Sequence, residues 1–236
     1  DPGRVGVPAA AAPGRRVRRS RSRLIDTVLR IAPFTVRVRS PFASVRRHIE
    51  IFYSGRAVGA GPGFVDFDVR IARGRGIRRW VRPQSRFLLD SFEPFLPLDA
   101  GQAGPMVEWG LNWAVAQRAL GYLVMHAAVV AKAGRAIVMP GFPGAGKSTL
   151  CASLVLLGGW RLFSDELAIV EPTSARLVPH PRPISVTNEA IDIVARFPGA
   201  HLGPTYVSAR KGLVSHVACP GDVVAGPDDT AGVHWV

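Results

Sequence analysis

The stretch that decides the fold occupies residues 141–149 and reads Gly141-Phe142-Pro143-Gly144-Ala145-Gly146-Lys147-Ser148-Thr149. It satisfies the pattern G-x-x-x-x-G-K-[ST] of a phosphate-binding loop. A short apolar run, residues 135–139, precedes it, and a segment with Leu150, Leu154 and Leu157 on one helical face follows it and ends at two glycines. The sequence therefore predicts the loop between a strand and a helix, which is the setting that this motif requires.

Each residue type in this loop has a chemical reason to be there. Glycines let successive backbone N–H groups turn toward one phosphate, and the N-terminus of the following helix adds its positive dipole end. Lys147 supplies a point charge for the β- and γ-phosphates, and the Ser148 hydroxyl is a ligand for Mg²⁺. Lys147 is also one of three lysines in a chain with 27 arginines. We therefore expect the nucleotide phosphates to be bound by Gly141, Pro143, Gly144, Ala145, Gly146, Lys147, Ser148 and Thr149.

The flanking segments predict a sheet around the loop. Residues 123–130 are apolar apart from His126, and with the turn at residues 132–134 and the run at 135–139 they predict a β-hairpin. Residues 160–164 read as a strand that ends in Asp165-Glu166, and residues 167–170 read as the next strand. We expect Asp165 at the end of a strand that neighbours the loop strand, where a carboxylate holds Mg²⁺ or accepts a proton from a hydroxyl. No further signature loop of a mechanical ATPase follows.

The stretch from His126 to Val170 resembles the HPr kinase/phosphorylase family. The resemblance lies in the loop, in a histidine at the interval His126 to Gly141, and in an acidic pair, Asp165-Glu166, where the founding family has Asp-Asp. The wider chain, roughly residues 24–219, is similar to the branch of HPr-related serine kinases. Segments of that branch recur here at residues 33–37, 80–84, 108–113, 164–167 and 181–185.

The resemblance implies an ATP- and Mg²⁺-dependent kinase that phosphorylates a hydroxyl, serine above all, of a protein or peptide. It implies a phosphoenolpyruvate-carboxykinase-like fold, with Asp165 as general base, Lys147 on the phosphates, His126 as a further catalytic-site residue, and Ser148, Asp165 and Glu166 around the metal. Arg182 and Lys211 are candidate charge clamps. His180 and His216 receive no role.

The part of the chain before the loop predicts a smaller α+β segment. Period-2 alternation predicts strands at residues 35–39 and 64–72, with another strand at 86–89, and residues 42–53 predict a helix. A second helix after Pro105 is expected to bury one stripe, formed by Met106, Trp109, Trp113, Ala116 and Leu120. We expect an α/β protein in which a mixed β-sheet carries the phosphate loop, with residues 24–100 as the small α+β region and 101–236 as the kinase domain.

The basic charge is unevenly distributed. The 236 residues carry a net charge of +13, of which residues 1–23, with seven arginines against Asp1, hold +6, so that +7 remains for the rest. The composition of residues 1–23 predicts a disordered basic arm, and we expect nucleic acid to bind weakly through this arm or not at all. Two cysteines, Cys151 and Cys219, indicate a reducing compartment, taken as the cytoplasm, and no apolar run reaches the ~18–20 residues of a membrane span. Because the chain starts without Met and ends on what reads as the start of a strand, residues 233–236, we expect a fragment truncated at its C-terminus.

Two other functions stay open at this point. A small-molecule kinase also has an acid at similar spacing after such a loop, although such folds usually begin with the loop strand. A regulatory module that binds ATP without transferring phosphate is the other alternative. The identity of the acceptor and the formation of a homo-oligomer are likewise left open.

Overall fold

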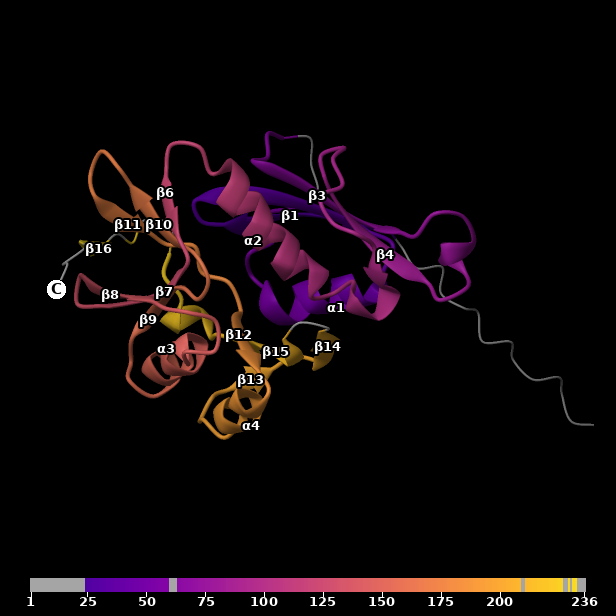
Figure 1. Ribbon diagram of the computed structural model, residues 1–236. Coiled ribbons are helices and arrows are strands. Elements are labelled where there is room, and N and C mark those ends of the chain that lie inside the picture. Colours follow the sequence, from indigo (N-terminus) through magenta and orange to yellow (C-terminus); the bar gives the residue numbers. More distant parts are fainter. Residues whose placement is uncertain (1–23, 60–62, 209–210, 227–228, 230, 233–236) are drawn as a thin grey trace, which may run out of the picture.

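The part of the chain that the structure describes folds into a mixed α/β structure with three sheets (Figure 1). The computed structural model describes residues 24–59, 63–208, 211–226, 229 and 231–232, and this part of the chain contains four α-helices. The α/β class predicted from the sequence is confirmed. The predicted basic arm, the centre of a Gly-rich loop at residues 60–62 and the predicted terminal strand at 233–236 lie outside the described residues.

A five-stranded sheet with two helices on one face forms the first part of the structure, called here the N-terminal unit (residues 25–118). Side chains alternate between buried and half-buried along its central strands, because one sheet face packs on the helices and the other meets solvent. The strand order is β1-β2-β3-β4-β5, with β2 and β3 parallel and the other pairs antiparallel. The elements are β1 (Ile25–Ile31), β2 (Phe34–Ser40), α1 (Ala43–Phe52), β3 (Phe67–Arg73), β4 (Gln84–Leu89), β5 (Leu98–Asp99) and α2 (Met106–Arg118).

Helix α2 exists as predicted, but the predicted buried stripe is wrong. Trp109 and Trp113 are only half-buried, Ala116 is exposed, and Leu120 is exposed beyond the end of the helix. The buried face instead consists of Met106, Val107, Glu108, Gly110, Leu111, Ala114 and Val115. The sequence pattern hid this face because it contains a charged residue with buried partners and a glycine at which a Cβ atom would overlap the Phe87 ring.

A seven-stranded sheet in the order β6-β10-β11-β16-β8-β7-β9 carries the loop strand. Its strand β7 is buried along Ala127–Ala131, because alternate residues pack on α3 and on a second apolar cluster at the opposite face. This two-sided burial explains the continuous apolar run in the sequence. The strands are β6 (Leu123–Met125), β7 (Ala127–Lys132), β8 (Arg135–Pro140), β9 (Arg161–Ser164), β10 (Ala168–Glu171), β11 (Arg176–Val178) and β16 (Ala231–Gly232).

Two details of this sheet correct the sequence prediction. The β7–β8 hairpin is confirmed, but the run before it is not one strand: the chain bends at His126, because β6 pairs with β10 whereas β7 pairs with β8 and β9. The strand that leads to Asp165, β9, neighbours β7 and not the loop strand β8. Since β8 and β9 are both antiparallel to β7, they run in the same direction and end on the same side of the sheet.

Helix α3 (Lys147–Leu156) lies between the seven-stranded sheet and a four-stranded sheet. It buries Cys151, Ala152 and Val155, whereas the predicted leucine face is half-buried at Leu154 and exposed at Leu150 and Leu157. The core pattern was missed because small residues, Cys and Ala, form the contact with β7. The four-stranded sheet consists of β12 (Ile184–Thr187), β13 (His201–Leu202), β14 (Tyr206–Ser208) and β15 (Gly212–Ala218), with α4 (Glu189–Ala195) after β12.

One apolar core joins the N-terminal unit to the loop-bearing sheet. Its buried members run from Ile25 in β1 to Ala119 after α2, and they include Leu167 and Ile169 at β10. Helix α2 comes after the boundary expected near residue 100, but it packs on β3 and β4, which come before that boundary. None of the helices in the described part of the chain has the length and apolar character that crossing a bilayer needs.

Candidate functional site

The predicted phosphate loop leads from β8 into the N-terminus of α3. Gly144 and Gly146 have φ angles of 84° and 82°, in the left-handed region that favours glycine, and Gly146 is the N-cap residue of α3. No described side chain caps this helix end, so its first backbone N–H groups are available to an anion. The Lys147 ammonium donates to the carbonyl oxygens of Gly141 and Phe142, at 2.7 and 3.1 Å.

Asp165 lies directly beside this helix end. Its carboxylate is 3% exposed, and Oδ2 accepts hydrogen bonds from the Ser148 hydroxyl, at 3.1 Å, and from the Ser185 backbone N–H, at 2.8 Å. Oδ1 is buried and has no hydrogen-bond partner among the described residues. The structure thus brings the loop serine and the predicted acid into contact, although the sheet separates their strands by β7.

Burial raises the pKa of Asp165 to about 7, and the neighbouring charge of Glu166 adds to this shift. The hydrogen bonds from Ser185 and Ser148 and the charge of Arg182 act in the opposite direction. A carboxyl group that titrates near neutral pH is suited to general-base chemistry, because both of its protonation states are accessible there.

The raised pKa gives a first testable prediction, on stability. Because folding raises the pKa of Asp165 from 3.8 to about 7, the ionised carboxylate destabilises the metal-free folded state above pH 7 and has no such effect below 3.8, where both states are protonated. Asp165→Asn should therefore raise the free energy of unfolding at pH 8, by up to about 4 kcal/mol, and the gain should shrink as the pH falls from 7 to 4. Urea unfolding at pH 8 and pH 5 measures this, with the exposed Asp222→Asn as control. Equal gains at the two pH values would contradict the assignment.

His126 and Glu166 form the outer part of the same region. His126 Nδ1 lies 3.7 Å from Glu166 Oε2, and the two side chains are 53% and 18% exposed. His126 occupies the bend between β6 and β7, at the mouth of the site. Among the described residues it makes no hydrogen bond or ion pair with Asp165.

These side chains line one cleft of about 860 Å³, within the ~300–1,000 Å³ range of ligand sites. Gly141 and Ala145 belong to the loop but do not line the cleft. The opposite wall of the cleft comes from β12, α4 and Lys211. Of this wall the sequence predicts only Lys211, since no spacing rule links the wall to the loop. The predicted site residues in the cleft are His126, Pro143, Gly144, Gly146, Lys147, Ser148, Thr149, Asp165 and Glu166, and the added ones are Ser185, Val186, Thr187, Asn188, Glu189, Ala190 and Ile193.

The oxygen atoms at the cleft suit a Mg²⁺ ion bound together with nucleotide phosphates. Mg²⁺ prefers hard oxygen ligands and takes one or two of them from protein when phosphates and water supply the others. Ser148 and Asp165 are in contact, Glu166 is adjacent, and Asp165 Oδ1 is a buried oxygen atom without a hydrogen-bond partner in the described chain. Among the described residues no group of three or more His, Cys, Asp or Glu side chains could hold a metal ion by itself. A metal ion at this cleft would need further oxygen ligands, such as phosphate or water oxygens, besides Ser148 and the two carboxylates.

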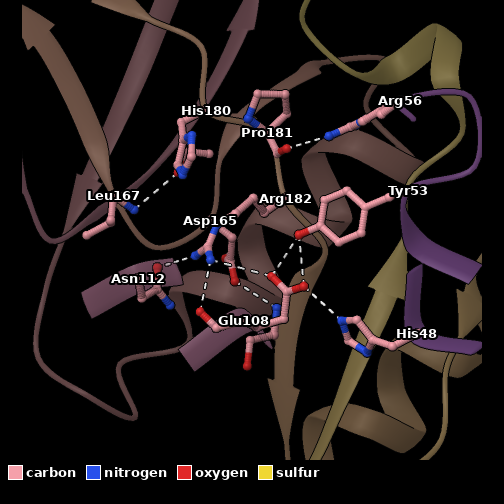
Figure 2. A network of polar contacts seen from close by, with 12 residues as sticks. His48, Tyr53, Arg56, Glu108, Asn112, Asp165, Leu167, His180, Pro181 and Arg182 are labelled. Atoms are coloured by element: carbon pink, nitrogen blue, oxygen red, sulfur yellow. Dashed lines mark hydrogen bonds and ion pairs between the residues drawn. The ribbon is translucent and has the colours of Figure 1, made fainter. Parts of the chain in front are cut away.

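Arg182 does not behave as the predicted clamp at the cleft. It is 5% exposed and belongs to a buried polar network with Glu108 and Asn112 of α2 (Figure 2). Glu108 also accepts hydrogen bonds from His48 Nε2 and the Tyr53 hydroxyl, both at 2.8 Å. Burial alone would raise the pKa of Glu108, but the His48 hydrogen bond and the Arg182 charge together lower it to about 2. Glu108 is therefore a carboxylate at all ordinary pH values.

The two histidines without a predicted role are buried next to this network. Burial lowers the pKa of His180 to about 3 and that of His216 to about 4. His180 Nδ1 donates to the carbonyl oxygen of Ala32 at 2.9 Å. Both imidazoles are neutral at pH 7; His180 is held by its hydrogen bond, and the His216 ring packs against the rings of His48 and Phe52.

A second concave region, of about 550 Å³, lies on the N-terminal unit away from the loop. Leu24, the residue that follows the basic arm, lines it. Part of the charge outside the arm is gathered there, since the lining includes Arg39, Arg70, Arg73, Arg75, Arg79 and Arg86. Two acids, Asp68 and Glu93, pair with three of these arginines.

Comparisons with known proteins leave the site to be judged on its geometry, because no protein-family model, curated protein or solved structure matches the chain.

Proposed function

We propose that the chain is an ATP- and Mg²⁺-dependent kinase that transfers the γ-phosphoryl group to a hydroxyl, serine above all, of a protein or peptide. One observation carries the proposal: the loop serine Ser148, one residue after the loop lysine, contacts a buried carboxyl group, Asp165, whose pKa is about 7. An acid beside the loop serine can serve as a metal ligand in any nucleotide site, and a pKa near neutral in addition suits it to accept a proton.

The residues of the cleft have separate roles in this proposal. The loop amides and Lys147 bind the phosphates, and Ser148, Asp165 and Glu166 offer oxygen atoms to the metal. Asp165 Oδ1 is the oxygen atom without a partner, so it is the atom that accepts the proton from the acceptor hydroxyl. Bound MgATP would supply the phosphoryl group, and its metal ion would offset the negative charge of the phosphates. His126 at the mouth, near Glu166, and Lys211 on the opposite wall lie where they can meet the acceptor.

The resemblance to HPr-related kinases supports a protein or peptide acceptor and a phosphoenolpyruvate-carboxykinase-like arrangement around the loop. We place the reaction in the cytoplasm, where both free cysteines, Cys151 and Cys219, would stay reduced.

The direct test is γ-phosphate labelling of proteins in a lysate by the purified chain. A labelled band that depends on the parent chain and disappears with Lys147→Ala supports the proposal. Labelling of a metabolite fraction alone would favour a small-molecule kinase, and ATP binding without any labelling would favour a regulatory module.

The basic arm gives a second prediction, on binding. The loop holds ATP through amides, Lys147 and the metal, so the chain that starts at Leu24 should bind ATP as the full chain does, at low and at physiological salt. Weak DNA binding by the full chain should depend on residues 1–23 and fall steeply with salt, because seven arginines contact phosphates electrostatically.

Fluorescence titration of both chains with ATP and with DNA, at two salt concentrations, measures these affinities. Loss of ATP binding on removal of the arm would contradict the prediction. DNA binding that persists without the arm would assign it to the arginine-lined cleft of the N-terminal unit.

A further inference from the structure

The segment between β11 and β12 is held by the N-terminal unit at three successive residues, and the contacts of two of them, Pro181 and Arg182, are shown in Figure 2. His180 donates to the Ala32 carbonyl, the Pro181 carbonyl accepts from Arg56 Nη1 at 2.5 Å, and Arg182 donates to the Glu108 carbonyl at 3.0 Å and to the Asn112 side chain. All residues from 179 to 184 are buried. A segment fixed in this way has little freedom of its own.

The same segment holds the candidate base. The His180 backbone N–H donates to the Phe163 carbonyl at 2.8 Å, and the Ser185 backbone N–H donates to Asp165 Oδ2 at 2.8 Å. His180 in the segment thus contacts β9, and Ser185, the second residue of β12, contacts the residue that follows β9. Any shift of residues 180–185 would move the hydrogen bond that orients the Asp165 carboxylate.

Arg182 is the charged anchor of this arrangement. Its Nη1 lies 3.5 Å from Glu108 Oε2, and the side chains of Arg182 and Glu108 are 5% and 4% exposed. Glu108 is in turn fixed by His48 and Tyr53 from α1 and the residue after it. The position of Arg182 therefore depends on both helices of the N-terminal unit.

We propose that Arg182 is a positioning residue for phosphate transfer, which fixes residues 180–185 against α2 so that the Ser185 amide holds the Asp165 carboxylate in place. The N-terminal unit then takes part in the reaction, although among the described residues none before His126 lines the cleft. This inference rests on the proposed kinase function. It assigns a role in the reaction to a region that, among the described residues, makes no hydrogen bond or ion pair with the phosphate loop.

The test uses the full chain with Arg182→Met and, as a milder variant that leaves the Arg182–Glu108 pair intact, Asn112→Ala. Hydrogen exchange of the peptide that covers residues 180–187 should become about tenfold faster, with α3 unchanged. The rate of phosphate transfer should fall about 10²-fold for Arg182→Met and less for Asn112→Ala, at unchanged ATP affinity, because a misplaced base affects the transfer step. Arg182→Lys, which keeps the charge but not the forked geometry, should recover part of the rate. Arg39→Met, which breaks the Arg39–Asp68 ion pair of the five-stranded sheet, is the matched control and should change neither quantity.

Two results would overturn the inference: unchanged exchange in folded Asn112→Ala and Arg182→Met, or faster exchange with the parent rate of transfer. If Arg182→Met fails to fold, Asn112→Ala decides by the same criteria. If the parent chain transfers no phosphate to any acceptor, the proposed function fails separately. Exchange at residues 180–187 then decides alone whether Arg182 holds the segment that orients Asp165.

Discussion

Asp165→Asn is expected to reduce the rate of phosphate transfer by about 10²–10⁴, the range for loss of a general acid or base, while ATP affinity stays within a few-fold. The amide keeps an oxygen atom that can accept the hydrogen bonds from Ser148 and Ser185, so the geometry of the cleft should persist. What the variant loses is the capacity to accept a proton near neutral pH. Single-turnover labelling of an identified acceptor measures the rate, and calorimetry measures the affinity for ATP.

Glu166→Gln provides the comparison for this experiment. Glu166 lies beside the base and near His126, and it should affect metal dependence more than the transfer step. If Asp165→Asn transfers phosphate at the parent rate and Glu166→Gln does not, the base has been assigned to the wrong carboxyl group.

Lys147→Ala is expected to weaken ATP binding by about 10- to 100-fold, which corresponds to the loss of hydrogen bonds to charged groups at ~1.5–3 kcal/mol. The fold should remain intact, because the ammonium of Lys147 contacts only two carbonyl oxygens of its own loop among the described residues. Lys132→Ala is the matched control: this lysine also donates to a carbonyl oxygen, that of Gly158 at 2.8 Å, but lies at the end of β7 and does not line the cleft. A folded Lys147→Ala protein with the affinity of the parent would contradict the assignment of the loop.

The strand, turn and helix around residues 141–149, and the place of Asp165 directly after a strand, were predictable because local rules determine them. The spacing of Gly141, Gly146 and Lys147 is set by the path of the loop backbone, and the turn into α3 follows from this path. The alternation between buried and more accessible residues in β2 and β3 was equally readable, because one side of the five-stranded sheet faces solvent.

The errors arise where distant segments decide the environment. From the sequence, Glu108 is expected on the surface of α2, because its partners, His48 and Arg182, are 60 and 74 residues away in the chain. The opposite wall of the cleft, with Asn188, depends on the turn between β12 and α4, and no motif relates that turn to the loop. The break at His126 was missed because the apolar pattern continues through it while the pairing partner changes.

The core that joins the two parts of the molecule also has an evolutionary consequence. Leu167 and Ile169 pack with the strands and helices of the N-terminal unit, so the loop-bearing sheet has no complete apolar core without that unit. Recombination that attached residues 101–236 to an unrelated partner would expose the inner side of β10 and separate α2 from the sheet that it covers. Natural variants of this architecture should therefore inherit both parts together, and insertions should be found in connecting loops rather than at a junction near residue 100.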